Sequence, residues 1–481
     1  MIDMRSMMRV GLLLGLIGCH AAAPKSSSEP VAPNPTGMTI TARIALAPGA
    51  TPARTRGTLA VMWLTASERE AFESGKVSVG LLRELVTRTE LIGEVDATQD
   101  RAFTVHAPRG RVALHAALDV NQTGIEAIIG NGDGTLSGMS PMFDVGNAGD
   151  AAIEAPVIVV NGRAKRALRD PCEGDRMTIE HIEAPEVAGT VGNPTSRRFC
   201  VRVPVGYADH PGWRYPVVYA LPGLGSTDKA VIASYQLDPP DTIVVAVDTR
   251  TTTGSTYLVD NATNGDWDTF FARKLIPYVD AHYRTLARRQ ARGITGHSTG
   301  GFNAVSYGLR HPELFGAIAA SSPDWLDLSV WLTADGTALP WIRDFARVER
   351  GLGGVGQFIS YAANWSPIEA GTGYDWIFDA SGALVDRVWQ RWLANAPRSW
   401  LRNPARVASL APLSGKIYLT VGERDEFELR PPTVGFSEAL TAAGIANELV
   451  VTSGDHDSTV EHMAAIVKFL AATLEPADRA R

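Results

Sequence analysis

The sequence contains few cysteines, no excess of basic residues and no long apolar run. Cys19, Cys172 and Cys200 form no CxxC pair, so the sequence contains no zinc-binding cluster. Lys and Arg together number 45 and Asp and Glu 52, which gives a net charge of −7. This balance argues against a nucleic-acid-binding surface, because such a surface needs a basic stripe. No apolar segment reaches the roughly 18 residues of a membrane-spanning helix, which excludes a multi-pass membrane protein.

The remaining composition is typical of a globular protein. Hydrophobic residues make up 45% and charged residues 20% of the 481 residues, which is enough for a sizeable core. At about 150 residues per domain, the length predicts two or three domains, or one large domain with an appendage.

The N-terminal residues are typical of an export signal. Two arginines precede the short apolar run at residues 10–17, which stops at Cys19. This pattern predicts a secretion signal over residues 1–19. A cysteine after small residues resembles the bacterial lipobox, in which cleavage leaves a lipidated N-terminal Cys19; ordinary cleavage with a free cysteine is the alternative. Residues 20–37 are rich in Pro and Ser and predict a flexible tether. We therefore expect an extracytoplasmic, membrane-anchored bacterial lipoprotein.

Export also changes what is expected of the other two cysteines. An isolated pair in an oxidising compartment tends to be bridged. The sequence therefore predicts a disulfide between Cys172 and Cys200, with two buried free thiols as the alternative.

The pattern of apolar residues divides the rest of the chain into two domains. Over residues 38–161 apolar and polar residues alternate with period two and Gly/Asn/Asp clusters intervene, which predicts a small Ig-like β-sandwich. Over residues 162–481 short apolar runs alternate with helical segments, which predicts an α/β domain with a mostly parallel sheet covered by helices. Strands are expected at 199–203, 217–221, 243–247, 293–295, 317–320, 417–421 and 449–451, and helices at 267–283, 301–310, 434–443 and 459–474.

One segment, residues 322–414, breaks this alternation. An insertion of this size in an α/β domain is typical of a lid over the site, although the aromatic rings could equally form the insertion's own core. It contains eight of the eleven tryptophans of the chain: Trp325, Trp331, Trp341, Trp365, Trp376, Trp389, Trp392 and Trp400.

The motif with the clearest chemistry is Gly296-His297-Ser298-Thr299-Gly300. It lies between a predicted strand and a predicted helix, where a nucleophile elbow holds a serine in strained backbone geometry. The glycines on either side leave room for close packing. The motif predicts Ser298 as a nucleophile, while His297 is expected to point away from the substrate and to be structural.

A serine nucleophile needs a base, and the base needs an acid that orients it. The acid is expected after a late strand, where Asp425 follows the strand predicted at 417–421; Glu423 and Glu426 are alternatives. In α/β domains with such an elbow, the three groups follow along the chain in the order serine, acid, histidine.

The base is expected in the loop before the last helix, where His456 lies. His462 is the alternative, but it falls inside the predicted helix, where it is less free to reach a nucleophile.

An oxyanion hole requires two backbone N–H groups. One is expected from Thr299, which follows the nucleophile. The other is expected from the glycine-containing loop at residues 222–226, with Leu224 as the candidate donor.

Five segments between about residues 197 and 474 carry a resemblance to a known family. They are residues 215–225 (YPVVYALPGLG), 264–267 (NGDW), 275–280 (LIPYVD), 296–301 (GHSTGG) and 454–456 (GDH). Together they resemble the esterase D-like branch of the α/β-hydrolases, which includes feruloyl and acetylxylan esterases, S-formylglutathione hydrolases, enterochelin-type esterases and mycolyltransferases. This chain has Pro222 where the family usually has His. Some members carry an N-terminal β-sandwich.

The resemblance implies a function. Ser298 would be the nucleophile, Asp425 the acid, His456 the base, and Leu224 and Thr299 the oxyanion donors of a secreted serine esterase. It would act through an acyl-enzyme on an acylated sugar, aromatic or siderophore ester, without a metal or organic cofactor. An acyltransferase that passes the acyl group to an envelope glycan, and a non-catalytic surface binding protein, stay open. The sequence does not determine the oligomeric state.

Overall fold

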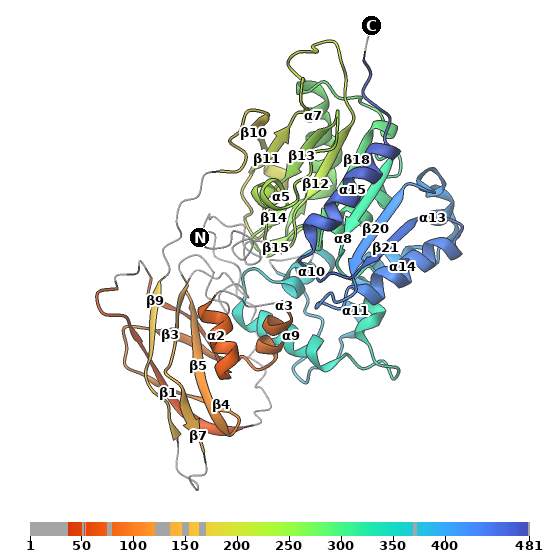
Figure 1. Cartoon of the computed structure of the whole chain (residues 1–481). Helices are drawn as coiled ribbons and strands as arrows, with labels where there is room; N and C mark the ends of the chain where they lie inside the picture. Colours follow the sequence, from red (N-terminus) through yellow and green to blue (C-terminus); the bar gives the residue numbers. More distant parts are fainter. Residues whose placement is uncertain are drawn as a thin grey trace.

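The structure is a computed structural model with two domains, a β-rich N-terminal domain and a larger α/β domain (Figure 1). The predicted signal, Cys19 and the tether lie outside the described residues. Over the described ranges, no helix combines the length and the apolar composition needed to cross a membrane. The structure describes residues 37–50, 52, 54–74, 79–120, 135–146, 153–162, 170–368 and 373–479.

The N-terminal domain has nine described strands that form one hydrogen-bonded sheet. The order is β3-β2-β5-β6-β9-β1-β4, with β7 paired to β5 and β8 to β1. The end strands β3 and β4 also contact each other, so the sheet curls around its apolar side chains. The strands are β1 (Met38–Leu46), β2 (Arg56–Leu64), β3 (Glu90–Asp96), β4 (Ala102–Ala107), β5 (Gly110–Asp119), β6 (Leu136–Met139), β7 (Phe143–Val145), β8 (Ile153–Glu154) and β9 (Ile158–Gly162).

This β-rich domain was predicted, but its sheet differs from two separate amphipathic layers. Helices α2 (Ala66–Glu73) and α3 (Val79–Thr87) follow β2 in the chain. Leu59 and Val61 of β2 point into the core of the curled sheet. Ala60 and Met62 alternate with them and are also buried, in a second cluster with side chains of α2 and α3. Both faces of β2 are therefore covered, which an alternating pattern alone does not indicate.

The α/β domain is built on an eight-stranded sheet with the order β10-β11-β13-β12-β18-β19-β20-β21. β10 and β11 are antiparallel to their neighbours, and the pairs from β13 to β21 are parallel. The central strands are buried on both faces, as is typical of parallel sheets. The strands are β10 (Met177–Glu183), β11 (Ser196–Arg202), β12 (Val217–Leu221), β13 (Ile243–Val247), β18 (Arg292–His297), β19 (Ala317–Ser321), β20 (Ile417–Gly422) and β21 (Glu448–Thr452).

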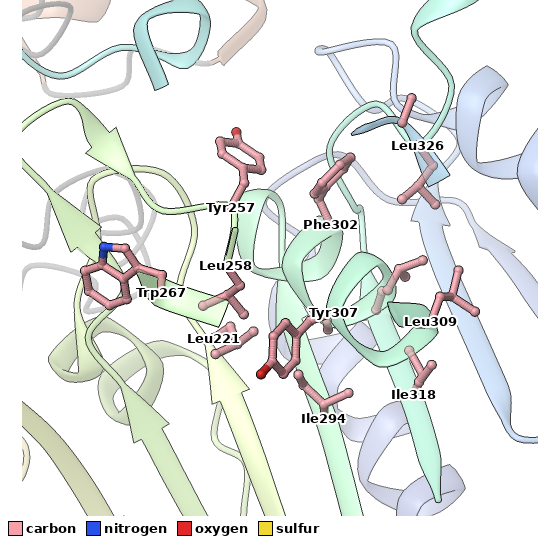
Figure 2. Close-up of a cluster of buried hydrophobic side chains, with 14 of the residues drawn as sticks. Leu221, Tyr257, Leu258, Trp267, Ile294, Phe302, Tyr307, Leu309, Ile318 and Leu326 are labelled. Atoms are coloured by element: carbon pink, nitrogen blue, oxygen red, sulfur yellow. The ribbon is translucent and has the colours of Figure 1, made fainter. Parts of the chain in front are cut away.

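Helices cover both faces of this sheet. One face packs against α5 (Asp228–Ser234) and α15 (Thr459–Thr473). The other packs against α8 (Thr299–Arg310) and α14 (Arg430–Ala442), and against α6 (Trp267–Phe270) and α7 (Ile276–His282), which one π-helical turn (Phe271–Leu275) joins. Figure 2 shows Phe302 and Tyr307 of α8 among the apolar side chains of this second face. This is the predicted α/β-hydrolase arrangement.

The segment between β19 and β20 is helical and has an aromatic core. Trp331 contacts the rings of Trp325, Phe358, Trp389 and Trp392 at centroid distances of 5.1 to 6.3 Å. The tryptophans therefore pack chiefly on one another. The helices are η4 (Leu328–Trp331), α9 (Pro340–Leu352), α10 (Gln357–Trp365), α11 (Asp386–Asn395), α12 (Pro397–Trp400), α13 (Pro404–Ser409) and η5 (Ala411–Leu413).

Helix α9 of this insertion also contacts the N-terminal domain (Figure 1). Val348 and Leu352 of α9 are buried together with side chains of β2, α2 and α3. Gly351 lies so close to β3 that an added Cβ would fall 2.0 Å from Leu91 Cδ1. We call this contact the α9 interface.

The structure does not show the predicted disulfide, because Cys172 and Cys200 are buried free thiols in it. Both lie in the apolar cluster beneath α5. The Cys172 thiol also donates to the Asp228 carboxylate, with Sγ 3.7 Å from Oδ2. A hydrogen bond with Cys200 and burial raise the pKa of Cys172, which favours the protonated thiol.

Candidate active site

Ser298 lies at the junction of β18 and α8 in a backbone conformation that few residues adopt. Its φ is +56° and its ψ −125°, and such strain is typical of functional turns. The flanking glycines are required by close approach. A Cβ at Gly296 would lie 2.3 Å from the carbonyl oxygen of Gly300, and a Cβ at Gly300 would lie 2.1 Å from that of Leu221.

The structure brings Asp425 and His456 together from the ends of two neighbouring strands. Asp425 follows β20 and His456 follows β21, and Asp425 Oδ2 lies 2.9 Å from His456 Nδ1. Both residues are buried. Burial lowers the pKa of His456, but the Asp425 carboxylate more than offsets this effect and raises it to about 9. Asp425 Oδ1 accepts the backbone N–H of Phe427 at 3.1 Å, which orients the carboxylate.

The two alternative acids have partners other than the His456 ring. Glu423 is exposed and pairs with Arg430 at 3.8 Å. Glu426 accepts the backbone N–H of His456 at 3.1 Å, so it fixes the loop rather than the ring.

The other two histidines of this region lie in a hydrogen-bonded layer next to His456. His462 Nδ1 lies 3.0 Å from the Ser321 hydroxyl and its Nε2 lies 2.9 Å from that of Thr452. Burial lowers the pKa of His462 to about 4. His297 contacts the same Ser321 hydroxyl at 3.0 Å, and its ring lies 4.6 Å from that of His456. Burial lowers the pKa of His297 well below its usual range.

The loop after β12 lies beside Ser298. A Cβ at Gly223 would lie 3.6 Å from Ser298 Cβ, so the following residue, Leu224, is close to the elbow. Thr299 is the first residue of α8, and the N–H groups of a helix's first turn have no acceptor within the helix. Both predicted oxyanion donors are thus near Ser298.

The sequence analysis missed a buried polar network next to Ser298. Asp324 follows β19, the neighbour of β18, and its Oδ1 accepts from Ser298 Oγ at 3.4 Å. Its Oδ2 accepts from Thr299 Oγ1 at 2.7 Å, Gln357 Nε2 at 2.8 Å and Tyr257 OH at 3.2 Å. A signal existed, because ligands of open α/β sheets bind beyond the carboxyl ends of the strands, and Asp324 lies just after the strand predicted at 317–320.

Gln357 reaches this network because a buried carboxylate holds the start of α10. Glu349 of α9 accepts the backbone N–H groups of Gln357 at 2.8 Å and Phe358 at 2.7 Å. Burial raises the pKa of Glu349 to about 8 against these hydrogen bonds. The same helix, α9, forms the α9 interface, so the N-terminal domain supports the helix that holds Gln357.

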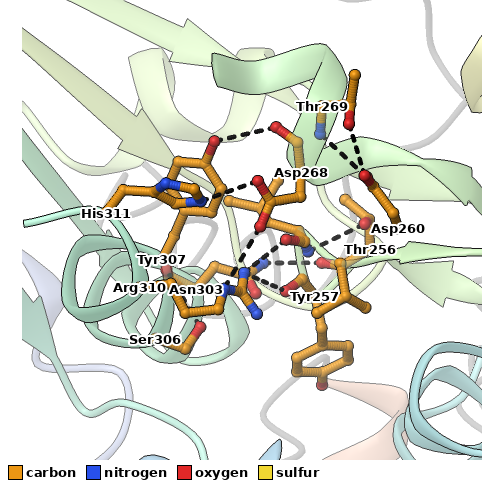
Figure 3. Close-up of polar contacts among 12 residues, drawn as sticks. Thr256, Tyr257, Asp260, Asp268, Thr269, Asn303, Ser306, Tyr307, Arg310 and His311 are labelled. Atoms are coloured by element: carbon orange, nitrogen blue, oxygen red, sulfur yellow. Dashed lines mark hydrogen bonds and ion pairs between the residues drawn. The ribbon is translucent and has the colours of Figure 1, made fainter. Parts of the chain in front are cut away.

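Tyr257 is held from α8. Figure 3 shows Asn303 donating to the carbonyl of Thr256 at 2.9 Å and Arg310 donating to those of Tyr257 and Leu258. These hydrogen bonds fix the backbone around Tyr257 and so hold its ring next to the insertion.

The described residues contain no group of three His, Cys, Asp or Glu side chains that could hold a metal ion.

Several known proteins are similar to parts of this chain. Two curated esterases of Mycobacterium tuberculosis, Esterase MT1326 and Esterase Rv1288, are each 33% identical to this chain over 57 residues, which is 12% of this chain and 12% of each relative. Among solved structures, a ferulic acid esterase is 18% identical, with 62% of this chain and 97% of that chain covered and a TM-score of 0.42. An S-formylglutathione hydrolase from Agrobacterium tumefaciens is also 18% identical, with 62% and 95% covered and a TM-score of 0.41.

The family comparison covers more than half of the chain. The model of the family described as "Putative esterase" matches residues 193–464, which include Ser298, Asp425 and His456. The chain therefore belongs to the putative esterase family.

Proposed function

We propose that this protein is a serine carboxylic-ester hydrolase. The observation that carries the proposal is the strained elbow of Ser298 beside a buried pair in which Asp425 Oδ2 lies 2.9 Å from His456 Nδ1. A positioned histidine with an orienting carboxylate is the arrangement that activates a serine hydroxyl.

The reaction has two steps. Ser298 Oγ attacks the ester carbonyl carbon while His456 Nε2 takes its proton, and the N–H groups of Leu224 and Thr299 stabilise the oxyanion. The imidazolium then gives the proton to the leaving alcohol, which leaves an acyl-enzyme. Water attacks the acyl-enzyme by the same route and releases the acid. The Asp425 carboxylate stabilises the imidazolium in both steps.

One rotation precedes the first step. In the described structure, Ser298 Oγ donates its hydrogen bond to Asp324 rather than to His456. We propose that the hydroxyl turns toward His456 Nε2 as substrate binds, by a change of the Ser298 χ1 rotamer. The helical insertion, residues 322–414, contributes Asp324 and Gln357 to the site, and we propose that it acts as a lid.

We propose that the ester substrate is an acylated sugar, an aromatic ester or a siderophore ester. An acceptor sugar added to the assay separates hydrolysis from acyl transfer, because transfer gives a new acylated sugar while hydrolysis gives only the free acid. A dry, covered site would favour transfer.

We also propose that the protein is exported and anchored through a lipidated Cys19, on the sequence pattern of residues 1–19. Metabolic labelling with an alkyne fatty acid tests this. The wild type should be labelled and membrane-bound, whereas Cys19→Ala should be unlabelled; equal labelling of both would contradict the anchor.

The enzymatic proposal is tested with p-nitrophenyl butyrate and a fluorophosphonate probe on the purified chain. The wild type should turn over the ester and be labelled, and Ser298→Ala should do neither. Ser381→Ala is the matched control, because Ser381 lies in an exposed turn of the insertion, and among the described residues its backbone N–H and hydroxyl both donate to Asp379. It should behave as wild type. A wild type that neither labels nor turns over, or a Ser298→Ala variant that does both, contradicts the proposal.

A further inference from the structure

Asp324 is a carboxylate in an unusual place, because it is 3% exposed and touches the nucleophile. Its backbone N–H also donates to the carbonyl of Ser298 at 3.1 Å. The mechanism above does not use this side chain, and Asp425 already serves His456.

The two oxygens of Asp324 have different surroundings. Oδ2 accepts from Thr299, Gln357 and Tyr257. The amide of Gln357 is fixed in this orientation, because its Nε2 also donates to Tyr257 OH at 2.5 Å and its Oε1 faces Thr299 Oγ1 at 3.4 Å. Within the described ranges, Oδ1 accepts only the long bond of 3.4 Å from Ser298. One oxygen is thus saturated and rigid, and the other faces the reacting position.

The nearest cation that acts on Asp324 is His456, which the proposed mechanism already uses. Burial raises the pKa of Asp324, and hydrogen bonds from Thr299 and Gln357 together with the charge of His456 oppose that rise. In the described part of the chain, no lysine or arginine acts on the charge of Asp324. A buried carboxylate without a direct ion-pair partner is costly, and a cationic ligand would reduce this cost.

We propose that Asp324 is a specificity-determining residue that binds an ammonium group on the acyl part of the substrate, so that the preferred substrates are aminoacyl esters. This inference rests on the proposed esterase function and names its substrate class. In the tetrahedral step the carbonyl oxygen faces Leu224 and Thr299, and the alcohol oxygen faces His456. The side of Ser298 that Asp324 occupies is therefore left for the acyl group.

The reach is suitable. An amino group on the carbon next to the ester carbonyl lies about 2.5 Å from the carbonyl carbon. During attack that carbon lies about 3 Å from Ser298 Oγ, and Asp324 Oδ1 lies 3.4 Å from the same Oγ. An ammonium group there can take Oδ1 as acceptor once the serine hydroxyl has turned to His456. An acyl group with its own carboxylate would be repelled.

The test uses three benzyl esters whose acyl groups have nearly the same shape: alanine, lactate and isobutyrate. They differ only in an ammonium, a hydroxyl or a methyl group on the same carbon. We expect kcat/KM of the full chain at pH 7 to be at least about 10-fold higher for the alanine ester than for the isobutyrate ester, with the lactate ester between them. At this pH the α-amino group is largely protonated.

The variant Asp324→Asn removes the charge and keeps the shape. We expect the alanine-to-isobutyrate ratio to fall to within about 3-fold of unity, whatever the overall activity of the variant. Asp327→Asn is the matched control, because Asp327 belongs to the same loop but bonds Ser329 and Arg398. It should keep the wild-type ratio.

Three outcomes would overturn the inference. The wild type could hydrolyse the isobutyrate ester at least as well as the alanine ester, a result that decides the matter even if Asp324→Asn does not fold. Asp324→Asn could slow all three esters equally, which would assign Asp324 to the catalytic groups rather than to specificity. Finally, a wild type that neither labels with fluorophosphonate nor hydrolyses any ester would overturn the proposed function itself, which the first two outcomes leave intact.

Discussion

The strand ends of the parallel sheet and the helical insertion both contribute to the site, but they hold their residues by different means. Ser298, Asp425 and His456 lie within a few residues of β18, β20 and β21, so the hydrogen bonds of the sheet fix them. Gln357 lies far from any strand of that sheet and depends on Glu349, the aromatic core and the α9 interface. The sheet therefore holds the three proposed catalytic groups, whereas tertiary packing holds the residues around them.

If this comparison is correct, changes at the strand ends should reduce activity strongly with little effect on stability. Ser298→Ala or His456→Ala should lower kcat for p-nitrophenyl butyrate by about 10⁴-fold or more. The thermal midpoint should stay close to that of the wild type. Residual activity above a few per cent would show that these residues are not catalytic. The strand ends would then not carry the reacting groups.

The second prediction concerns the pH dependence of activity, which the proposed base His456 should set. His456 accepts the serine proton only when neutral, and the neighbouring carboxylate raises its pKa to about 9. Activity is lost as the pH falls through this pKa, so kcat/KM should rise from pH 6 toward pH 9. Asp425→Asn removes the carboxylate, so kcat should drop by about 10²- to 10⁴-fold and the remaining pH limb should move to lower pH. A limb that stays in place would show that Asp425 does not set the pKa of His456.

In the insertion, Glu349→Gln should affect stability more than chemistry. Glutamine has one acceptor oxygen where the carboxylate uses two, so we expect a loss of about 1–3 kcal/mol in the free energy of unfolding and a several-fold loss of kcat/KM as Gln357 loses its position. Urea denaturation and steady-state kinetics measure the two effects.

The pH dependence of stability gives this variant a sign test. The pKa of Glu349 is raised from 4.5 to about 8 in the folded state, so folding favours the protonated form. The stability contribution is present below the unfolded pKa and is lost as pH rises toward 8. Wild-type stability should therefore decrease over this range by more than that of Glu349→Gln, and identical slopes would show that burial does not raise the pKa of Glu349.

The smallest effect on activity is expected at the α9 interface. Leu352 is 4% exposed, so Leu352→Ala should reduce the free energy of unfolding by about 2–3 kcal/mol. The same variant should change kcat/KM by less than about 3-fold. Ile368→Ala is the control, since Ile368 is 39% exposed and its loss should cost at most about 0.5 kcal/mol. An inactive Leu352→Ala variant with wild-type stability would instead show that the α9 interface is needed for catalysis itself.

Much of the α/β domain could be predicted, because its signals are local. The strands predicted at 217–221 and 243–247 match β12 and β13 residue for residue. The elbow motif places Ser298 correctly between β18 and α8. The predicted helix at 267–283 contains a π-helical turn, and β10 was not predicted, because it lies at the sheet edge with mostly half-exposed side chains.

Local sequence patterns were enough to predict most strands of the α/β domain, the elbow and the order of the three candidate groups. Apolar runs and glycines act on the backbone within a few residues, so their effects can be read from the sequence. Only the tertiary structure decided that Cys172 and Cys200 stay free thiols and that the sheet of the N-terminal domain curls under helices. It alone also placed Tyr257 and Gln357, which are 100 positions apart, around Asp324. Such contacts depend on how separate elements pack, and the surroundings of a buried charge are therefore a property of the folded chain and not of its local pattern.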